Sequence, residues 1–222
     1  MLDMVQLKFY KSLLGLKPST PNCMVYGELG CYPVSLSIKI RMVGYWLKLC
    51  SAEDNKISKR LYNLLYHFHE TNVYDSEWLT HIRDIIQVIG LGHIWQSQGM
   101  HYNHGAIKED VKYRLQCEFV QEWHGLVEDS GKCTLYKNIK TKFMLEPYLY
   151  RSPKSVWKYI VKVRCSNHKL AVEKGRYNRI ERRLRHCEMC NMSALGDEYH
   201  AFLECNNPEI VHLRQRFIPV KL

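Results

Sequence analysis

The sequence predicts an all-α protein, a multi-helix array that ends in a small zinc knuckle. Apolar residues recur at the spacing of amphipathic helices over most of the 222 residues. No segment shows the sustained alternation of a half-buried strand, and no Asn-Gly pair indicates a tight hairpin, although short β pairing around the knuckle is compatible with the pattern. Near the C-terminal end, the spacing Cys-x2-Cys-x9-His-x4-Cys is typical of a metal site.

Six helical segments are expected before residue 130, each with apolar side chains along one side. Glycine or proline marks several of their ends: Gly15 with Pro18 beyond it, and Gly30 and Gly90, each after an apolar run. The expected segments are residues 3–16, 22–29, 34–50, 61–68, 79–89 and 105–127.

A domain boundary is expected at residues 128–134, where turn-forming residues interrupt the helical pattern. Residues 1–130 would then form a helical region. Residues 131–222 would form a second region, in which basic helices precede the zinc knuckle at 187–205.

The positive charge of the chain is concentrated in one stretch. The formal net charge is +10, and the stretch from Arg151 to His186 holds 12 Lys or Arg residues against two acidic residues, Glu173 and Glu181. The rest of the chain is therefore neutral. Such a local excess usually binds a polyanion, and nucleic acid is the default candidate. The alternative is a solvated surface without a partner.

Two helical faces would carry these cations. Lys154, Lys158 and Lys162 recur every four residues, so they would lie along one side of an amphipathic helix. Four arginines between residues 176 and 183 would gather on one side of a second helix. The inner stripe of that helix would be Tyr177, Ile180 and Leu184. The predicted nucleic-acid-binding residues are Lys154, Lys158, Lys162, Lys169, Lys174, Arg176, Arg179, Arg182, Arg183 and Arg185.

Aromatic residues are interleaved with these cations. Trp157, Tyr159 and Tyr177 could stack on bases, although Trp157 could equally belong to the core. Arginine suits phosphate because its planar guanidinium group donates two parallel hydrogen bonds. The pattern predicts contact with nucleic acid without choosing between RNA and DNA, since both present the same phosphates.

Cys187, Cys190, His200 and Cys205 are predicted to bind one structural Zn²⁺. Three thiolates and one imidazole complete a tetrahedral shell and leave no position for water, which argues against catalysis at the metal. Asp197 is placed to cap a short helix that contains His200 and ends near Cys205.

Two alternatives to this ligand set stay open. His186 stands next to Cys187 and could replace His200 as the nitrogen ligand. The pattern could also be a coincidence, because the chain has nine cysteines and 11 histidines. Beyond the knuckle, Asn207 could cap a last helix that has Pro208 at its first position.

No catalytic motif is present, so an enzyme is not expected. The sequence contains no G-x-x-x-x-G-K-[ST] loop, no G-x-S-x-G elbow, no H-E-x-x-H pair and no adjacent aspartates of the kind found in polymerase metal sites. The N-terminal residues, with an acid at Asp3, do not resemble a signal peptide. Unpaired cysteines favour a reducing compartment, so we expect an intracellular protein of the nucleus or cytoplasm without a membrane span.

Three segments and the Cys/Cys/His/Cys pattern resemble a known family. The segments are residues 9–16 (Phe-Tyr-Lys-Ser-Leu-Leu-Gly-Leu), 21–30 (Pro-Asn-Cys-Met-Val-Tyr-Gly-Glu-Leu-Gly) and 167–176 (Asn-His-Lys-Leu-Ala-Val-Glu-Lys-Gly-Arg). Together they resemble the region downstream of the polymerase domain in LINE-type (non-LTR) retrotransposon reverse transcriptases of animals, the reverse transcriptase zinc-binding domain family. The resemblance covers nearly the whole chain, and Tyr-Gly-Glu-Leu-Gly and the knuckle are its most specific parts.

The resemblance implies a thumb-like and linker region over residues 1–130, followed by a zinc knuckle that helps to hold template RNA or target DNA. Its zinc ligands would be Cys187, Cys190, His200 and Cys205. Two features depart from the family pattern: Cys31 stands where arginine is expected, and the nine-residue spacer is longer than in a gag-type knuckle. The palm and endonuclease domains are missing, so polymerase activity is not expected.

These observations predict a retroelement-derived module that binds nucleic acid, has one structural zinc ion and takes no small-molecule substrate. The first alternative is a helical scaffold or protein-interaction module, in which zinc is purely structural and the basic face binds an acidic partner. The second alternative is a relic of an element, without a selected function. Salt dependence of binding and competition by RNA would separate the first two, since phosphate contacts release counterions.

Overall fold

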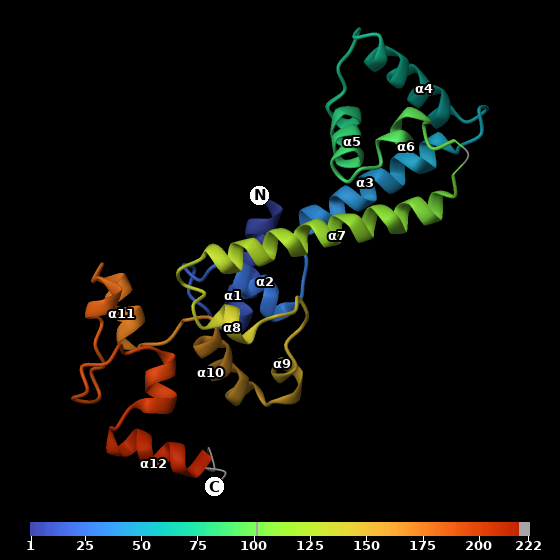
Figure 1. Cartoon of the computed structure of the whole chain (residues 1–222). Helices are drawn as coiled ribbons and strands as arrows, with labels where there is room; N and C mark the ends of the chain where they lie inside the picture. The colour runs from blue at the N-terminus through green and yellow to red at the C-terminus, as the bar shows by residue number, and fades with distance from the viewer. Residues whose placement is uncertain (101, 218–222) are drawn as a thin grey trace. The chain divides into compact units, whose positions relative to one another are not determined.

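The computed structural model describes residues 1–100 and 102–217, and it confirms the predicted all-α fold (Figure 1). Within these residues the β-type pairing is limited to two isolated bridges, one between Leu29 and Leu145 and one between His186 and Leu195. The helices are α1 (Leu2–Leu14), α2 (Asn22–Leu29), α3 (Val34–Cys50), α4 (Ile57–Glu70), α5 (Glu77–Val88), α6 (Gly92–Gln96), α7 (His104–Asp129), α8 (Tyr136–Ile139), α9 (Tyr148–Arg151), α10 (Lys154–Arg164), α11 (Ala171–Tyr177), the 3-10 turn η1 (Arg182–Leu184), the π-helical turn η2 (His200–Glu204) and α12 (Pro208–Phe217).

The chain forms two compact units that interleave in sequence. The first unit comprises Met1–Gln6 and Tyr32–Trp123, and the second comprises Leu7–Cys31 and His124–Leu222. Of the second unit, residues 218–222 lie outside the described part of the chain. The domain boundary predicted between residues 130 and 131 stays a prediction. In the structure, residues 7–31 belong to the second unit, which also contains the basic stretch and the four predicted metal ligands.

The first unit is organised around the apolar stripes of α3, α5, α6 and the first part of α7, which share one core (Figure 1). Trp46 of α3 is fully buried, stacks on Trp95 with 5.5 Å between ring centroids, and donates a hydrogen bond of 2.9 Å to the Tyr62 hydroxyl. A buried indole needs such a partner for its N–H group. The aromatic cluster therefore joins α3 to α4 and α6. The hydrogen bond to Tyr62 also satisfies the N–H group of the buried Trp46 indole.

The start of α3 is capped by residues distant in sequence. Pro33 precedes this helix and makes no side-chain capping bond. Instead, Asp3 accepts a hydrogen bond of 2.9 Å from the Ser35 backbone N–H, and the Gln6 side chain accepts one of 2.9 Å from Val34. These bonds satisfy N–H groups that every helix leaves free at its start, so they fix residues 1–6 against the first unit.

The second unit is organised around a buried carboxylate in α2. Glu28 is completely buried, and Arg164 of α10 donates to both of its oxygens, from Nε at 3.1 Å and from Nη2 at 3.0 Å. The Tyr148 hydroxyl also donates to Glu28, and Glu146 lies 3.1 Å from Arg164. Burial disfavours the guanidinium charge, but the hydrogen bonds and charge of Glu28 outweigh it and raise the pKa of Arg164.

Gly30 explains the end of the Tyr-Gly-Glu-Leu-Gly segment. Its φ angle of +58° lies in the left-handed region, where glycine ends helices most readily. A Cβ atom at this position would lie 2.2 Å from the Leu145 backbone nitrogen. The close approach is maintained by the bridge between Leu29 and Leu145 and by a hydrogen bond of 2.9 Å from the Glu146 N–H to the Glu28 carbonyl. Only glycine fits between these two backbone segments.

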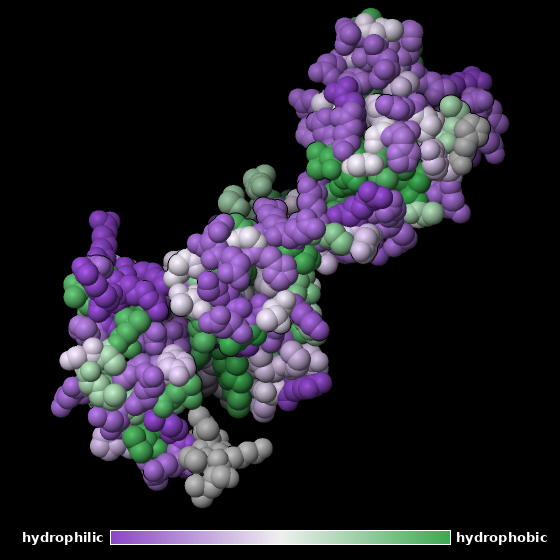
Figure 2. Space-filling view, viewed as in Figure 1, coloured by the Kyte–Doolittle hydropathy of each residue, from purple (hydrophilic) through white to green (hydrophobic). Residues whose placement is uncertain are grey.

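Two further expectations concern cysteines and membranes. None of the nine cysteines, all of which lie within the described residues, forms a disulfide. Among the helices of the described residues, none combines the length and the apolar character that a membrane crossing requires. Figure 2 shows a face on which hydrophilic residues predominate, with apolar residues visible between them.

The buried ion pair generates a stability prediction. Arg164→Ala is expected to lower the free energy of unfolding by about 3–5 kcal/mol, because it leaves the Glu28 carboxylate buried without its cationic partner. Urea denaturation followed by circular dichroism measures the change. Lys137→Ala is the control, since its ion pair with Glu128 (3.4 Å) is solvent-exposed and should contribute less than about 1 kcal/mol. Equal small losses in both variants would contradict a buried, charged pair.

Gly30 generates a second stability prediction. Gly30→Ala is expected to destabilise the protein by about 2 kcal/mol or more, because it combines a left-handed φ with a backbone clash. Gly125→Ala is the matched control: Gly125 lies in α7, and its added Cβ would have no atom within 4 Å. That variant should gain up to about 1 kcal/mol from helix propensity. Thermal denaturation measures the stability of both variants. Similar stabilities would contradict the prediction, because they would show that the backbone of residues 144 and 145 can move away from a side chain at position 30.

Candidate metal centre

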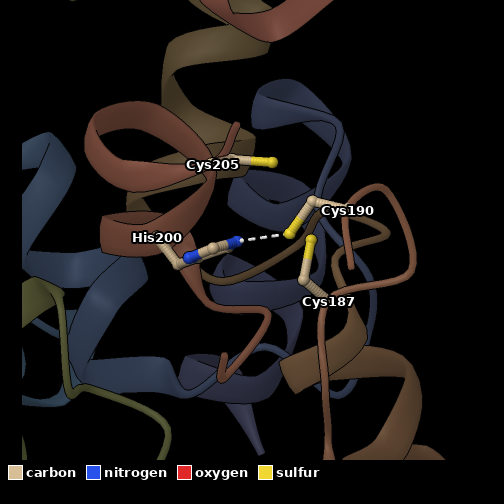
Figure 3. Close-up of side chains that lie close together, drawn as sticks. All are labelled: Cys187, Cys190, His200 and Cys205. Atoms are coloured by element: carbon tan, nitrogen blue, oxygen red, sulfur yellow. Dashed lines mark hydrogen bonds between the residues drawn. The ribbon is translucent and has the colours of Figure 1, made fainter. Parts of the chain in front are cut away.

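The four predicted ligands converge in the second unit (Figure 3). Cys187, Cys190, His200 and Cys205 each present one ligand atom, and all of these atoms lie within 4.8 Å of one another. The Cys190 sulfur lies 3.3 Å from His200 Nε2. A tetrahedral metal ion with bonds of about 2.0–2.3 Å would separate its ligand atoms by about 3.3–3.8 Å, so the distance between Cys190 and His200 suits two ligands of one metal ion.

The first ligand pair sits in a knuckle between two short antiparallel segments. The Cys187 N–H donates to the Ala194 carbonyl at 2.8 Å, and the Gly196 N–H donates to the Arg185 carbonyl at 2.9 Å. Inside the resulting turn, the Met189 N–H donates to the Cys187 sulfur at 3.4 Å. This is the short β pairing that the sequence left open. It orients the sulfurs of Cys187 and Cys190 toward one point (Figure 3).

The second ligand pair is positioned by η2. As expected, Asp197 accepts a hydrogen bond of 3.0 Å from the His200 N–H. The predicted short helix is present and ends before Cys205, but its last turn is a π-helix, because the Cys205 N–H bonds to the His200 carbonyl at 2.7 Å in the i to i+5 pattern. In an α-helix, residue 205 would point about 140° away from residue 200. The wider π turn brings both side chains to the same side.

The alternative nitrogen ligand is excluded by position. His186 is exposed and forms the bridge with Leu195, so it lies outside the cluster that His200 completes. His200 itself is buried, and its second ring nitrogen, Nδ1, makes no hydrogen bond. The Glu204 carboxylate lies 3.7 Å from that nitrogen. Histidines that bind metals usually donate their second N–H to such a group, which makes Glu204 the candidate outer partner.

Local hydrogen bonds favour the metal-binding form of one thiol. The backbone N–H of Met192, together with hydrogen bonds to His200, Cys187 and Cys205, lowers the pKa of Cys190 to about 7. Burial has the opposite effect on Cys205, whose pKa is raised. Because the thiolate is the species that binds metal, Cys190 is the thiol best prepared for an incoming cation.

α11 packs directly on the knuckle. The Val172 N–H donates to the Gly196 carbonyl at 3.0 Å, and a Cβ atom on Gly196 would lie 2.7 Å from the Cβ of Ala171. A second connection, missed by the sequence analysis, is the ion pair between His168 and Glu198 at 2.6 Å. Both partners are largely buried, and they join the segment before α11 to the turn that carries His200. No sequence spacing pairs these two residues, which are 30 positions apart.

The first group of predicted nucleic-acid-binding residues lies where it was expected. Lys154, Lys158 and Lys162 follow one another at four-residue intervals along α10, the first two exposed and the third half-buried. Lys169 is exposed in the segment before α11. In the described part of the chain, none of these four ammonium groups forms an ion pair with a carboxylate.

The second group does not form the predicted helix. α11 ends at Tyr177, Arg179 has a left-handed φ of +57°, and the chain continues into the 3-10 turn η1. The predicted inner stripe is therefore wrong: Tyr177 is 90% exposed, and Leu184 and Ile180 are also exposed, at 57% and 41%. The helical projection failed because it assumed that the helix continues through Asn178 and Arg179.

Most cations of this second group already have partners. Lys174 pairs with Glu188, and Arg176 pairs with Glu173 at 2.8 Å. Arg185 donates to the backbone carbonyls of Ile180 and Val172. Arg182 and Arg183 pair with Asp197 at 3.4 Å and Glu181 at 2.7 Å, respectively. These residues are partly occupied by contacts that shape the loop between α11 and the knuckle.

No protein-family model, curated protein or solved structure matches this chain. The resemblance to LINE-type reverse transcriptases therefore stays a prediction from the sequence. The four converging side chains are the most specific arrangement in the described part of the chain, and they indicate a metal site.

The cluster predicts one metal ion per chain. Native mass spectrometry of the purified protein should show this ion, and Cys187→Ser or His200→Ala should lose it, because each removes one of four ligands. His186→Ala is the matched control and should retain the metal, since this neighbouring histidine lies outside the cluster. Loss of metal in the His186 variant, or retention in the His200 variant, would contradict the assigned ligand set.

Proposed function

We propose that this chain is a retroelement-derived, zinc-stabilised module that binds nucleic acid. The observation that carries the proposal is a set of exposed cations in the same unit as the four-ligand cluster. Within the described residues, Lys154, Lys158, Lys169 and Arg179 are exposed and form no ion pair with a carboxylate. Cations that the fold itself does not neutralise are free to bind phosphates.

Zinc is the proposed metal because the donor set is soft and complete. Three cysteine sulfurs and one histidine nitrogen in a closed shell are typical of structural zinc sites. Such a shell has no position for water, so the proposal is a binding protein rather than an enzyme. The absence of disulfides among the nine cysteines of the described residues supports a reducing compartment, and we propose the nucleus or the cytoplasm.

The segment around the knuckle has a specific need for a metal. Between residues 182 and 216, the buried apolar side chains are Cys187, Ala201 and Cys205. Two of these three are ligands of the cluster, so the segment has almost no apolar core of its own. A structural zinc ion can contribute on the order of 10 kcal/mol to folding, which would replace the missing core.

A second candidate function is a protein-interaction module. A groove of about 650 Å³ in the second unit is lined mainly by apolar residues, including Leu170, Met189, Phe202 and Leu213. Exposed apolar surface of this kind often marks a protein-binding site. In that case zinc would be purely structural, and the basic face would bind an acidic protein partner.

Binding of single-stranded RNA at several salt concentrations tests the proposal. Fluorescence anisotropy with the zinc-loaded chain should show an affinity that falls with salt, because each phosphate contact releases counterions. Removing three cations with Lys154→Gln, Lys158→Gln and Lys162→Gln should lower the slope of log K against log salt by up to about 2, at about 0.7 per contact on a single strand.

The matched control removes three exposed lysines from the first unit, with Lys39→Gln, Lys48→Gln and Lys56→Gln. This variant should keep the slope of the wild-type chain. Equal effects of the two triple variants would indicate unspecific attraction by net charge. Absence of RNA binding, together with binding of an acidic peptide, would replace the proposal with the protein-interaction module.

A further inference from the structure

A pocket of about 580 Å³ lies in the second unit, beside α11. Three segments that are far apart in sequence form it: Lys17 and Ser19 between α1 and α2, Lys132 after α7, and residues of the stretch 166–178. Pockets that bind small ligands typically measure about 300–1,000 Å³. Neither Lys17 nor Lys132 belongs to the basic stretch that the sequence singled out.

The pocket is lined by five cations and one carboxylate. The carboxylate is Glu173, which already lies 2.8 Å from Arg176 and 3.9 Å from Lys132. Lys17 and Lys169 form no ion pair among the described residues. The five cations of the lining are Lys17, Lys132, Lys169, Lys174 and Arg176. Lys174 pairs with Glu188, which lies outside the lining. The carboxylate of Glu173 cannot neutralise the other four cations, so the pocket has an excess of positive charge.

The cations are held close enough to repel one another. Burial lowers the pKa of Lys132, and the neighbouring charges of Arg176 and Lys17 lower it further, although Glu173 acts in the opposite direction. Backbone carbonyls hold the two central groups in place: Lys132 donates to Ser19 at 3.4 Å, and Arg176 donates to Gly131 at 2.9 Å. A bound anion would relieve this repulsion.

A large aromatic ring stands at the same pocket. Tyr177 lines it and is 90% exposed, although the sequence predicted this residue on an inner face. Sites that bind single strands combine cations along the backbone with aromatic rings on which bases stack.

We propose that this pocket binds one nucleotide of a single-stranded nucleic acid. The phosphate would contact Lys17, Lys132 and Arg176, and the base would stack on Tyr177. A base-paired duplex does not suit the site, because its bases are stacked inside the helix and cannot reach a separate ring. The assignment rests on the proposed function and names the place where the strand is held.

Two substitutions at exposed pocket residues test the two halves of the site. Tyr177→Ala should weaken binding of a single-stranded oligouridylate to the zinc-loaded full chain by roughly tenfold, with the salt dependence unchanged, because stacking is lost but no charge. Lys17→Gln should instead lower the slope of log K against log salt by about 0.7, the value of one phosphate contact. Fluorescence anisotropy in a salt series measures both quantities.

The matched controls lie outside the pocket in the same unit. Tyr150→Ala removes another exposed tyrosine, 61% exposed on α9, and Lys8→Gln removes another exposed lysine, on α1. Both should bind within about twofold of the wild-type chain. Unchanged circular dichroism and zinc content would verify that all four variants are folded.

Failure of the pocket and failure of the proposed function give different results. If the wild-type chain binds RNA and both pocket variants bind as the wild type does, the pocket assignment is wrong and the proposed function stands. If the wild-type chain binds no RNA at any salt concentration, both are wrong. Uridine monophosphate that binds as tightly as the oligonucleotide would overturn the assignment to a strand.

Discussion

The buried carboxylate of Glu28 is the interaction on which the second unit depends. A charge without exposure to water is tolerated only when partners surround it, and here Arg164 and Tyr148 both donate to it. Arg164 ends α10, whose outer side carries the lysines of the proposed RNA-binding face. Because Glu28 accepts from two guanidinium nitrogens, it restricts the orientation of that helix as well as its position. A buried carboxylate of α2 therefore positions the helix that carries three of the exposed or half-buried lysines.

The second constraint acts where apolar packing ends. Beyond residue 182, the described chain buries few apolar side chains. A metal ion bound by the four converging side chains would join the hairpin turn that carries Cys187 and Cys190 to the π turn that begins at His200. An α-helical turn would point the side chains of His200 and Cys205 in different directions. The backbone here instead forms the rarer i to i+5 hydrogen bond of a π turn. The π turn therefore places the two side chains where a single metal ion could contact both of them.

Much of this fold could be predicted from the sequence because its signals are local. Proline and glycine mark the two ends of α2, and proline marks the start of α3. The spacing of the cysteines and the histidine identified the cluster. Long-range pairings left no such signal. Nothing in the sequence selects Arg164 among the basic residues as the partner of Glu28, or brings Lys17 and Lys132 to α11. Tyr177 was misplaced for a related reason, since the helical projection could not show that α11 ends there.

The proposed zinc ion and the proposed nucleotide pocket would be coupled through α11. The Val172 N–H bonds to Gly196, and His168 pairs with Glu198, so α11 is attached to the knuckle at both its first residues and the segment before it. Arg176 and Tyr177 lie at the other end of the same short helix. A metal that orders the knuckle would thereby fix where these two side chains stand relative to Lys132. The metal would influence nucleotide binding by fixing the positions of these side chains. The free energy of binding would come from the cations and the tyrosine ring. A closed metal site without a bound water can therefore serve a binding protein.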